Sequence, residues 1–252
     1  MDHLIYTAMS GARRALDEQA VISHNLANAS TNGFRAQLMA SRAVPVEGPG
    51  ELSTRVSAGA STPGVDWSPG PVSSTGRELD VALDGNAWLA IQDDQGAETY
   101  TRRGDLQVDG NGLLRSGGHP VIGENGPIVV PLDAQVSIGR DGTISAIGAG
   151  QAPDALMPIG RLKLVEPGAR QLLRGDDGLF RAPPGADGQP GILPRGEGLT
   201  LRSGALEGSN VSPVESMVAM IDNARNYEMQ MQVIQTADEN AQRANSLLAL
   251  QG

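Results

Sequence analysis

One stretch of the chain carries oxygen-bearing side chains at the spacing of a calcium-binding loop. Residues 105–112 are Asp-Leu-Gln-Val-Asp-Gly-Asn-Gly, and such a loop supplies oxygens at alternate positions ahead of a glycine. The twelfth position is Ser116, however, where the loop needs a bidentate glutamate. Because Asp-Gly and Asn-Gly pairs are also the preferred residues of tight hairpin turns, we interpret residues 105–112 as a β-hairpin.

The other residue types that could do chemistry lie too far apart in the sequence to predict a site. His3, His24 and His119 have no second histidine at metal-ligand spacing. The carboxylate pairs 93–94 and 176–177 could in principle act as acid and base, but both are followed closely by glycine and are interpreted as solvated turns. We therefore predict no catalytic residue, no metal ion, no cofactor and no enzymatic activity.

Composition and charge exclude several classes of partner. The formal net charge is −10, and no cluster of lysine or arginine could neutralise a phosphate backbone, so a nucleic-acid partner is not expected. The first ten residues lack the basic start and apolar core of a cleavable signal peptide. No apolar run approaches the roughly 20 residues of a membrane span, which predicts no direct membrane insertion.

The N-terminal residues have the spacing of a helix that packs along one narrow seam. The steps of three and four average 3.5 residues, as in a coiled coil, and Gln19 fills the one polar place among Ile5, Ala8, Ala12, Ala15, Ile22 and Leu26. An ordinary amphipathic helix packed on its own domain is the alternative. We predict that the helix ends near Asn32-Gly33, since glycine suits a left-handed cap.

A second, longer helix is predicted to begin after Ser212-Pro213, where serine can cap and proline suits the first helical position. Its length of about 35 residues exceeds that of a usual globular helix. The predicted seam again has steps of three and four, and it consists of Met217, Met220, Ala224, Tyr227, Met231, Ile234, Asp238, Ala241, Asn245 and Leu248. Its methionines would pack on the first helix or form an adaptable binding surface.

Between the helices the sequence predicts a connector and a β-rich domain. Residues 35–76 are rich in Pro, Gly, Ser and Thr from residue 43 onward and are interpreted as an extended connector. Residues 77–202 contain recurrent Asp-Gly and Asn-Gly turn signals between short apolar runs, which is typical of an antiparallel sheet or barrel-like domain. The runs are 79–83, 88–92, 106–108, 128–130, 136–138 and 162–165.

Together these elements predict an α+β chain in which the N- and C-terminal helices pair as a coiled-coil-like hairpin around an intervening antiparallel β-rich domain. The predicted parts are 1–34, 35–76, 77–202 and 203–252. A two-helix hairpin with Ala, Gln, Asp and Asn in its seam buries little apolar area, so it should be marginal alone. Stability must then come from neighbouring subunits, and head-to-tail contacts that do not close generate filaments.

Two terminal motifs resemble those of flagellar rod and hook proteins. The N-terminal one is an Asn-Leu-Ala-Asn core that runs into a Thr-x-Gly-aromatic turn, here Asn25, Asn28, Thr31, Gly33 and Phe34. Its C-terminal counterpart is residues 204–215, with Asn210 and Pro213, followed by Arg-Asn-Tyr-Glu at 225–228. Residues 79–85, 100–106 and 118–121 are similar to the β domain of rod proteins, so the resemblance spans most of the chain.

The resemblance implies a structural subunit of the flagellar basal-body rod, most like the proximal rod class. Such a subunit is exported through the flagellar channel without a cleavable signal peptide and polymerises in the periplasm into the rod that transmits torque from motor to hook. Its partners would be copies of itself, neighbouring proximal and distal rod proteins and the export apparatus. The seam residues and both terminal motifs would form the assembly interface. A distal rod or hook subunit, or a ligand-binding β domain on a coiled-coil stalk, remains an alternative.

Overall fold

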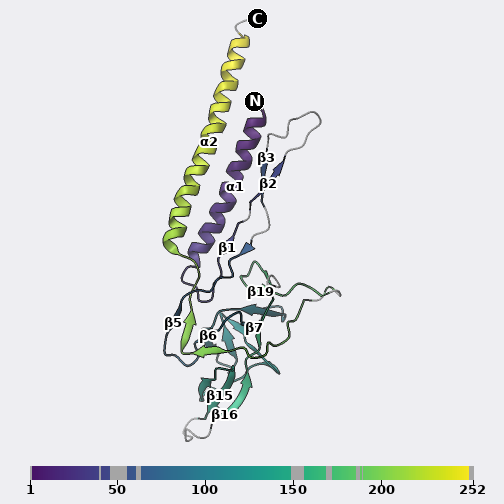
Figure 1. Cartoon of the computed structure of the whole chain (residues 1–252), viewed down its shortest axis with the longest axis vertical. Coiled ribbons are helices and arrows are strands. Elements are labelled where there is room, and N and C mark those ends of the chain that lie inside the picture. The colour runs from purple at the N-terminus through teal and green to yellow at the C-terminus, as the bar shows by residue number, and fades with distance from the viewer. Residues whose placement is uncertain are drawn as a thin grey trace. The chain divides into compact units, whose positions relative to one another are not determined.

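The computed structural model describes residues 2–39, 41–45, 56–60, 64–148, 156–168, 172–185, 188 and 190–249. It contains two long helices, α1 (Asp2–Ala27) and α2 (Pro213–Ala249), and many short strands between them (Figure 1). Every strand pair in the described part is antiparallel. The predicted α+β class is thus confirmed. Neither described helix is apolar over a stretch long enough to span a membrane.

The chain divides into two compact units that do not follow simple sequence blocks. The first unit comprises residues 1–29, 35–67 and 211–252, and the second comprises residues 30–34 and 68–210. The two terminal helices therefore belong to one unit together with the segment that follows α1, and most of the strands belong to the other.

In the first unit, α1 and α2 lie side by side and run in opposite directions (Figure 1). Gly11 lies against Gln230, and Asn223 bonds to Ala15 and Gln19, which fixes the register of the pair. With this register the start of α1 is level with about residue 239, and the last turns of α2 extend beyond it (Figure 1). The helix α2 begins at Pro213 as predicted, and the Ser212 hydroxyl accepts a hydrogen bond from the Glu215 amide at 3.4 Å.

The first helix ends at Ala27, earlier than the predicted end near Gly33. Asn28 terminates it locally, since its side-chain amide and its backbone N–H both donate to the His24 carbonyl oxygen, at 2.9 and 3.2 Å. Gly33 does adopt the left-handed conformation, with φ of 67°. Its N–H, however, donates to the carbonyl oxygen of Glu207 at 2.8 Å, so this glycine belongs to the second unit and does not cap the helix.

The segment 35–67 differs from the extended connector that its composition suggested. It contains the strands β1 (Gln37–Leu38), β2 (Ser41–Pro45), β3 (Val56–Ala60) and β4 (Gly64–Val65). These strands pair within the segment, β1 with β4 and β2 with β3. At its start, Asn25 of α1 exchanges two hydrogen bonds with the backbone of Gln37, at 2.9 and 2.8 Å. The segment is therefore part of the first unit and is held to α1.

The second unit consists of small antiparallel sheets. Its largest sheet has the order β17-β7-β8-β19-β18, and three-stranded sheets are β14-β15-β16 and β11-β10-β9. Two-stranded ladders join β12 to β13, β20 to β6 and β21 to β5. The strands are β5 (Val72–Ser74), β6 (Val81–Leu83), β7 (Trp88–Gln92), β8 (Glu98–Thr101), β9 (Leu106–Val108), β10 (Leu114–Ser116), β11 (His119–Pro120), β12 (Ile122–Gly123), β13 (Gly126–Pro127), β14 (Gln135–Ile138), β15 (Thr143–Ile147), β16 (Met157–Arg161), β17 (Leu164–Val165), β18 (Leu173–Arg174), β19 (Phe180–Arg181), β20 (Leu201–Ser203) and β21 (Ala205–Glu207).

The core of the second unit is aliphatic, with few rings. The rings of Trp88 and Phe180 pack with their centroids 4.7 Å apart. The almost fully buried aliphatic side chains are Leu89, Ile91, Leu106, Leu114, Val121, Ile144, Leu162 and Leu201.

The stretch 105–112 that has calcium-loop spacing is a hairpin between β9 and β10. The Asp109 carboxylate accepts hydrogen bonds from the amides of Asn111 and Leu113, each at 2.9 Å, and from Arg115. Asp93 also lies in a turn, but it is buried and bonds to Arg181, contrary to the solvated turn that we predicted.

Candidate functional site

The row of α1 residues predicted to form a seam is the least exposed row of that helix. Ala8, Ala12 and Ala15 are buried, and Ile5, Ile22 and Leu26 are half-buried. The small side chains allow the helices to approach closely. At Gly11, for example, an added Cβ would lie 2.9 Å from the side-chain carbon of Gln230, so the glycine makes room for that amide.

The row of α2 that faces α1 differs from the predicted one at every second position. The less exposed residues recur at steps of three and four and are Ser216, Met220, Asn223, Tyr227, Gln230, Ile234, Ala237 and Ala241. Met220, Tyr227, Ile234 and Ala241 belong to both the predicted and the observed row. Met217, Ala224 and Asp238 were predicted for the row but are exposed, and Met231 is half-buried beside it. The side chains of Asn245 and Leu248 lie outside the described residues.

Polar side chains occupy three of the four positions at which the rows differ: Ser216, Asn223 and Gln230. The Asn223 amide is buried and donates to the Ala15 carbonyl oxygen at 2.7 Å and to the Gln19 side-chain oxygen at 3.0 Å. Because a buried amide is tolerated once it is hydrogen-bonded, asparagine can stand where periodicity favoured an apolar residue. The sequence did contain a signal for these polar positions, because Gly11 lies against Gln230 and Gln19 bonds to Asn223. Hydrophobic periodicity does not take such polar partners into account.

The terminal motifs divide between the two units. Asn25 and Asn28 lie on the first unit, where they hold Gln37 and end α1. The residues Thr31, Gly33, Phe34 and Asn210 come together in the second unit. There the Phe34 amide donates to the Thr31 carbonyl oxygen, the Asn210 amide donates to the Phe34 carbonyl oxygen, each at 3.3 Å, and the Arg174 guanidinium lies 4.8 Å from the centre of the Phe34 ring. Pro213, the first residue of α2, is exposed.

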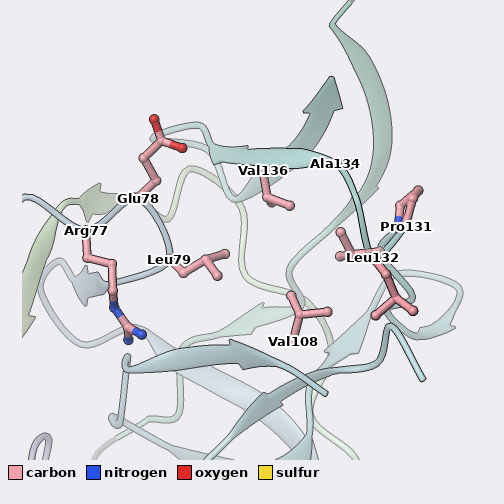
Figure 2. A pocket seen from close by; sticks show the side chains of 9 residues that line it. Arg77, Glu78, Leu79, Val108, Pro131, Leu132, Ala134 and Val136 are labelled. Atoms are coloured by element: carbon pink, nitrogen blue, oxygen red, sulfur yellow. The ribbon is translucent and has the colours of Figure 1, made fainter. Parts of the chain in front are cut away.

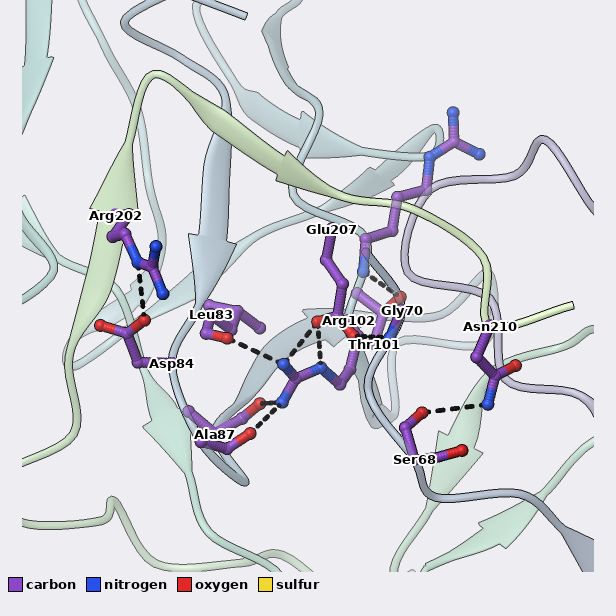
Figure 3. Close-up of polar contacts among 12 residues, drawn as sticks. Ser68, Gly70, Leu83, Asp84, Ala87, Thr101, Arg102, Arg202, Glu207 and Asn210 are labelled. Carbon is purple, nitrogen blue, oxygen red and sulfur yellow. Dashed lines mark hydrogen bonds and ion pairs between the residues drawn. The ribbon is translucent and has the colours of Figure 1, made fainter. Parts of the chain in front are cut away.

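Next to these residues a buried ion pair joins Arg102 to Glu207 (Figure 3). The Nε and Nη2 atoms of Arg102 donate to Glu207 Oε2 at 2.7 and 2.5 Å, and the two side chains are only 3% and 1% exposed. The other carboxylate oxygen of Glu207 accepts the Gly70 amide at 3.0 Å. The guanidinium also donates to the carbonyl oxygens of Leu83, Gly85 and Ala87. The charges are thus buried with nearly all their hydrogen-bonding capacity used.

We call Arg102, Glu207, Gly70 and Gly33 the Arg102 node. Gly33 belongs to it because its N–H bonds to the Glu207 backbone, and a Cβ on Gly33 would overlap the backbone of Arg102. The node therefore joins four parts of the chain: residues after α1, just before β5, just after β8 and at the end of β21. Sequence reasoning included Arg102 and Glu207 in motifs of the resemblance but assigned neither a role.

A surface groove of about 360 Å³ lies elsewhere on the second unit (Figure 2). Its one arginine, Arg77, is already ion-paired with Asp80, and most of its wall is aliphatic. The groove is lined by Arg77, Glu78, Leu79, Val108, Val130, Pro131, Leu132, Ala134 and Val136. Within the described part of the chain, no three His, Asp or Glu side chains gather as metal ligands would.

Three family models match the chain in the order of its elements. The model described as flagella basal body rod protein matches residues 5–35, the flagellar hook protein FlgE/F/G D1 domain matches 82–146, and the flagellar basal body rod FlgEFG protein C-terminal model matches 202–247. The FlgF basal-body rod proteins of Salmonella typhimurium and Escherichia coli are each 53% identical over 251 residues, which is 99% of this chain and 100% of theirs. The chain belongs to the flagellar basal-body rod protein family.

Within the flagellar basal-body rod family, the chain is more similar to these FlgF proteins than to a FlgG protein. FlgG of Bacillus subtilis is 30% identical over 263 residues, covering 96% of this chain and 98% of its own. The family predicted from the terminal motifs is therefore confirmed, and this chain is a structural protein of the basal-body rod. The matched regions contain the α1 row with Gly33 and Phe34, then Arg102, then Glu207 and the α2 row, so the inner rows of the helix pair and three of the four residues of the Arg102 node lie in family regions.

Proposed function

We propose that this chain is a proximal rod subunit that polymerises through its two terminal helices and transmits torque from the motor to the hook. The observation that carries this proposal is the distribution of apolar side chains on the helix pair. The fully buried residues of the inner rows are alanines and Asn223, whereas Tyr6 is 70% exposed and Met9 is 54% exposed. A pair that leaves large apolar side chains such as these exposed gains less from its own contacts than it would if they were buried.

The pair itself is inferred to be a coiled-coil-like hairpin. Both inner rows recur at alternating steps of three and four, which is the spacing that keeps one narrow seam against a facing helix. The Asn223 amide would fix the register of this seam, as buried polar residues do in coiled coils. The residues predicted for the assembly interface, which lie on both helices and in the two terminal motifs, would then be buried by neighbouring subunits wherever the pair itself leaves them exposed.

The second unit would form the outer part of the rod wall and contact adjoining subunits. Pairing of charges supports a structural rather than a catalytic role: the buried Arg102 pairs with Glu207, and the half-buried Lys163 pairs with Glu98 at 2.7 Å. Export through the flagellar channel into the periplasm, without cleavage of a signal peptide, follows from this proposal. The exported chain should therefore retain its N-terminal sequence, which mass spectrometry of isolated basal bodies would establish.

The proposal is tested by removing either helix in a flagellated bacterium whose own copy of the gene is deleted. Chains lacking residues 1–34 or 213–252 should be absent from isolated basal bodies and should not restore motility. The matched control is the full chain with Leu132→Ser, which changes an exposed side chain of the second unit and should assemble normally. Normal rods built from either truncated chain would refute the proposal.

A further inference from the structure

The surface groove of the second unit has no part in the proposed assembly through the helices. Leu79, Val108 and Val136 point toward one another across it (Figure 2). Val130 and Val136 are buried, and Leu79 and Val108 are half-buried. The groove therefore has a preformed aliphatic floor, which is the usual character of a binding groove.

One side of the groove is a tight turn that carries an apolar side chain at its tip. The Ala134 amide donates to the Pro131 carbonyl oxygen at 3.2 Å, so Leu132 and Asp133 occupy the two central positions of the turn. Such positions usually hold glycine, asparagine, aspartate or serine, whereas Leu132 is 63% exposed. A large apolar side chain held at an exposed tip beside an aliphatic floor is typical of a surface that contacts another protein.

The charges at the groove that lack a partner are negative. Glu78 and Asp133 are both exposed, and neither forms an ion pair with a described residue. The Glu78 carboxylate accepts a long hydrogen bond, at 3.5 Å, from the Gln135 side chain, while the positive charge of Arg77 is offset by Asp80. A partner that fills the groove should thus carry a positive charge beside its apolar side chains.

We propose that this groove binds a segment of a different protein in which a lysine or arginine lies next to aliphatic side chains. The aliphatic side chains would cover Leu132 and the floor, and the cation would lie near Glu78 or Asp133. This inference goes beyond the proposed function, because it gives the second unit a partner that is not a copy of this chain. It rests on that function only in placing the second unit on the outer part of the rod.

The second unit of another copy fits this description poorly. Arg140 is exposed and forms no ion pair with a described residue, but it stands between Gly139 and Asp141 and has no aliphatic neighbour to enter the groove. Arg174 lies over the Phe34 ring. The other described arginines and the lysine of this unit are already paired with carboxylates, and those that are not buried are Arg77, Arg103, Arg115, Arg161, Lys163, Arg181, Arg195 and Arg202.

A photoreactive side chain can identify what enters the groove. We would place p-benzoylphenylalanine at Leu132 of a tagged full-length chain in a flagellated bacterium that lacks its own copy, irradiate intact cells and sequence the cross-linked peptide by mass spectrometry. We expect a peptide of a different protein that contains a lysine or arginine next to aliphatic residues. The matched control has the same photoreactive side chain at Ile192, which is 67% exposed on the second unit but does not line the groove, and it should not give that adduct.

Charge reversal tests the recognition itself, whichever protein is captured. Glu78→Lys with Asp133→Lys should lower the yield of the Leu132 adduct by about fivefold or more, because like charges would then meet at the groove. The control pair, Glu166→Lys with Glu197→Lys, changes the net charge equally at two exposed residues that do not line the groove and form no ion pair with a described residue. It should change the yield by less than about twofold, since salt screens distant charges.

The outcomes separate this inference from the proposed function. All of these variants should still enter basal bodies, because neither helix is changed, and absence of the unmodified chain from basal bodies would refute the proposed function alone. The inference would be overturned by an adduct with a second copy of this chain, by an adduct peptide without a basic residue, by the same adduct from position 192, or by no adduct. Equal loss of yield in both charge-reversed pairs would also overturn it.

Discussion

Replacing Glu207 by alanine should destabilise the second unit more than any surface change. The carboxylate accepts two hydrogen bonds from Arg102 and one from the Gly70 amide, in a site where both ionic side chains are at most 3% exposed. Removing one partner of a buried pair typically costs about 3–5 kcal/mol, since the other charge stays buried. We therefore expect the free energy of unfolding to fall by about 3–5 kcal/mol, which lowers the melting temperature by roughly 6–20 °C in a chain of this size.

Tryptophan fluorescence during urea unfolding can measure this loss. Trp88 lies in the core of the second unit and is 1% exposed, whereas Trp67 belongs to the first unit, so a Trp67→Phe background makes Trp88 the sole reporter. The matched control is Arg202→Ala, which breaks the exposed Arg202–Asp84 pair shown in Figure 3 and should cost less than about 1 kcal/mol.

A double replacement decides whether the charges or the shape of the site matter. Arg102→Met with Glu207→Leu removes both charges together, so it should cost less than Glu207→Ala alone, by about 1 kcal/mol or more. If Glu207→Ala cost no more than the Arg202→Ala control, the node would not be a principal source of stability and the reasoning from burial would be refuted.

Three further substitutions or conditions test other parts of the structure. Gly33→Ala should lower the stability of the second unit by about 2 kcal/mol or more, because its φ is 67° and a Cβ would overlap the Arg102 backbone; a Trp88 unfolding curve like that of the unmodified chain would contradict this. Asn223→Ala should loosen the helix pair by about 1–3 kcal/mol by leaving the Ala15 and Gln19 oxygens without their donor; unchanged helical circular dichroism on heating would argue against it. A hydrogen bond from the Arg181 guanidinium lowers the pKa of Asp177. Burial alone would raise the pKa of Asp93, but hydrogen bonds from the Ala97 amide and from Arg181 outweigh burial and lower it. Carboxylates with lowered folded-state pKa values stabilise the fold above about pH 4 and lose that effect as the pH falls further, so Arg181→Gln should flatten the acid side of the stability profile.

Patterns that depend on neighbouring residues were predictable from the sequence. The start of α2 at Pro213 followed from a serine cap and a proline, and the α1 row followed from the spacing of alanines. The hairpin at residues 105–112 followed from its Asp-Gly and Asn-Gly pairs. In each case, the few residues that decide the structure lie within one or two turns of one another.

Contacts between distant parts of the chain could not be predicted in this way. The Asn223 amide enters the seam only because the Ala15 carbonyl and Gln19 lie opposite it, and periodicity cannot supply that register. Arg102 and Glu207 are 105 positions apart, and nothing in the local sequence of either marks it as buried. The end of α1 at Ala27 was missed because Gly33, the expected cap, is used by β21 instead.

The unequal lengths of the two helices have a consequence for how a stack of subunits would grow. The helix α2 has 37 residues and α1 has 26, so about 16 Å of α2 projects past the start of its companion. Lone helical turns are poorly stable in water, and these last turns would be stabilised by lying along the next subunit. The two ends of such a stack are then chemically unlike, since only one presents projecting helices. Addition would therefore have a direction, and a terminal layer would remain incomplete until a different protein capped it.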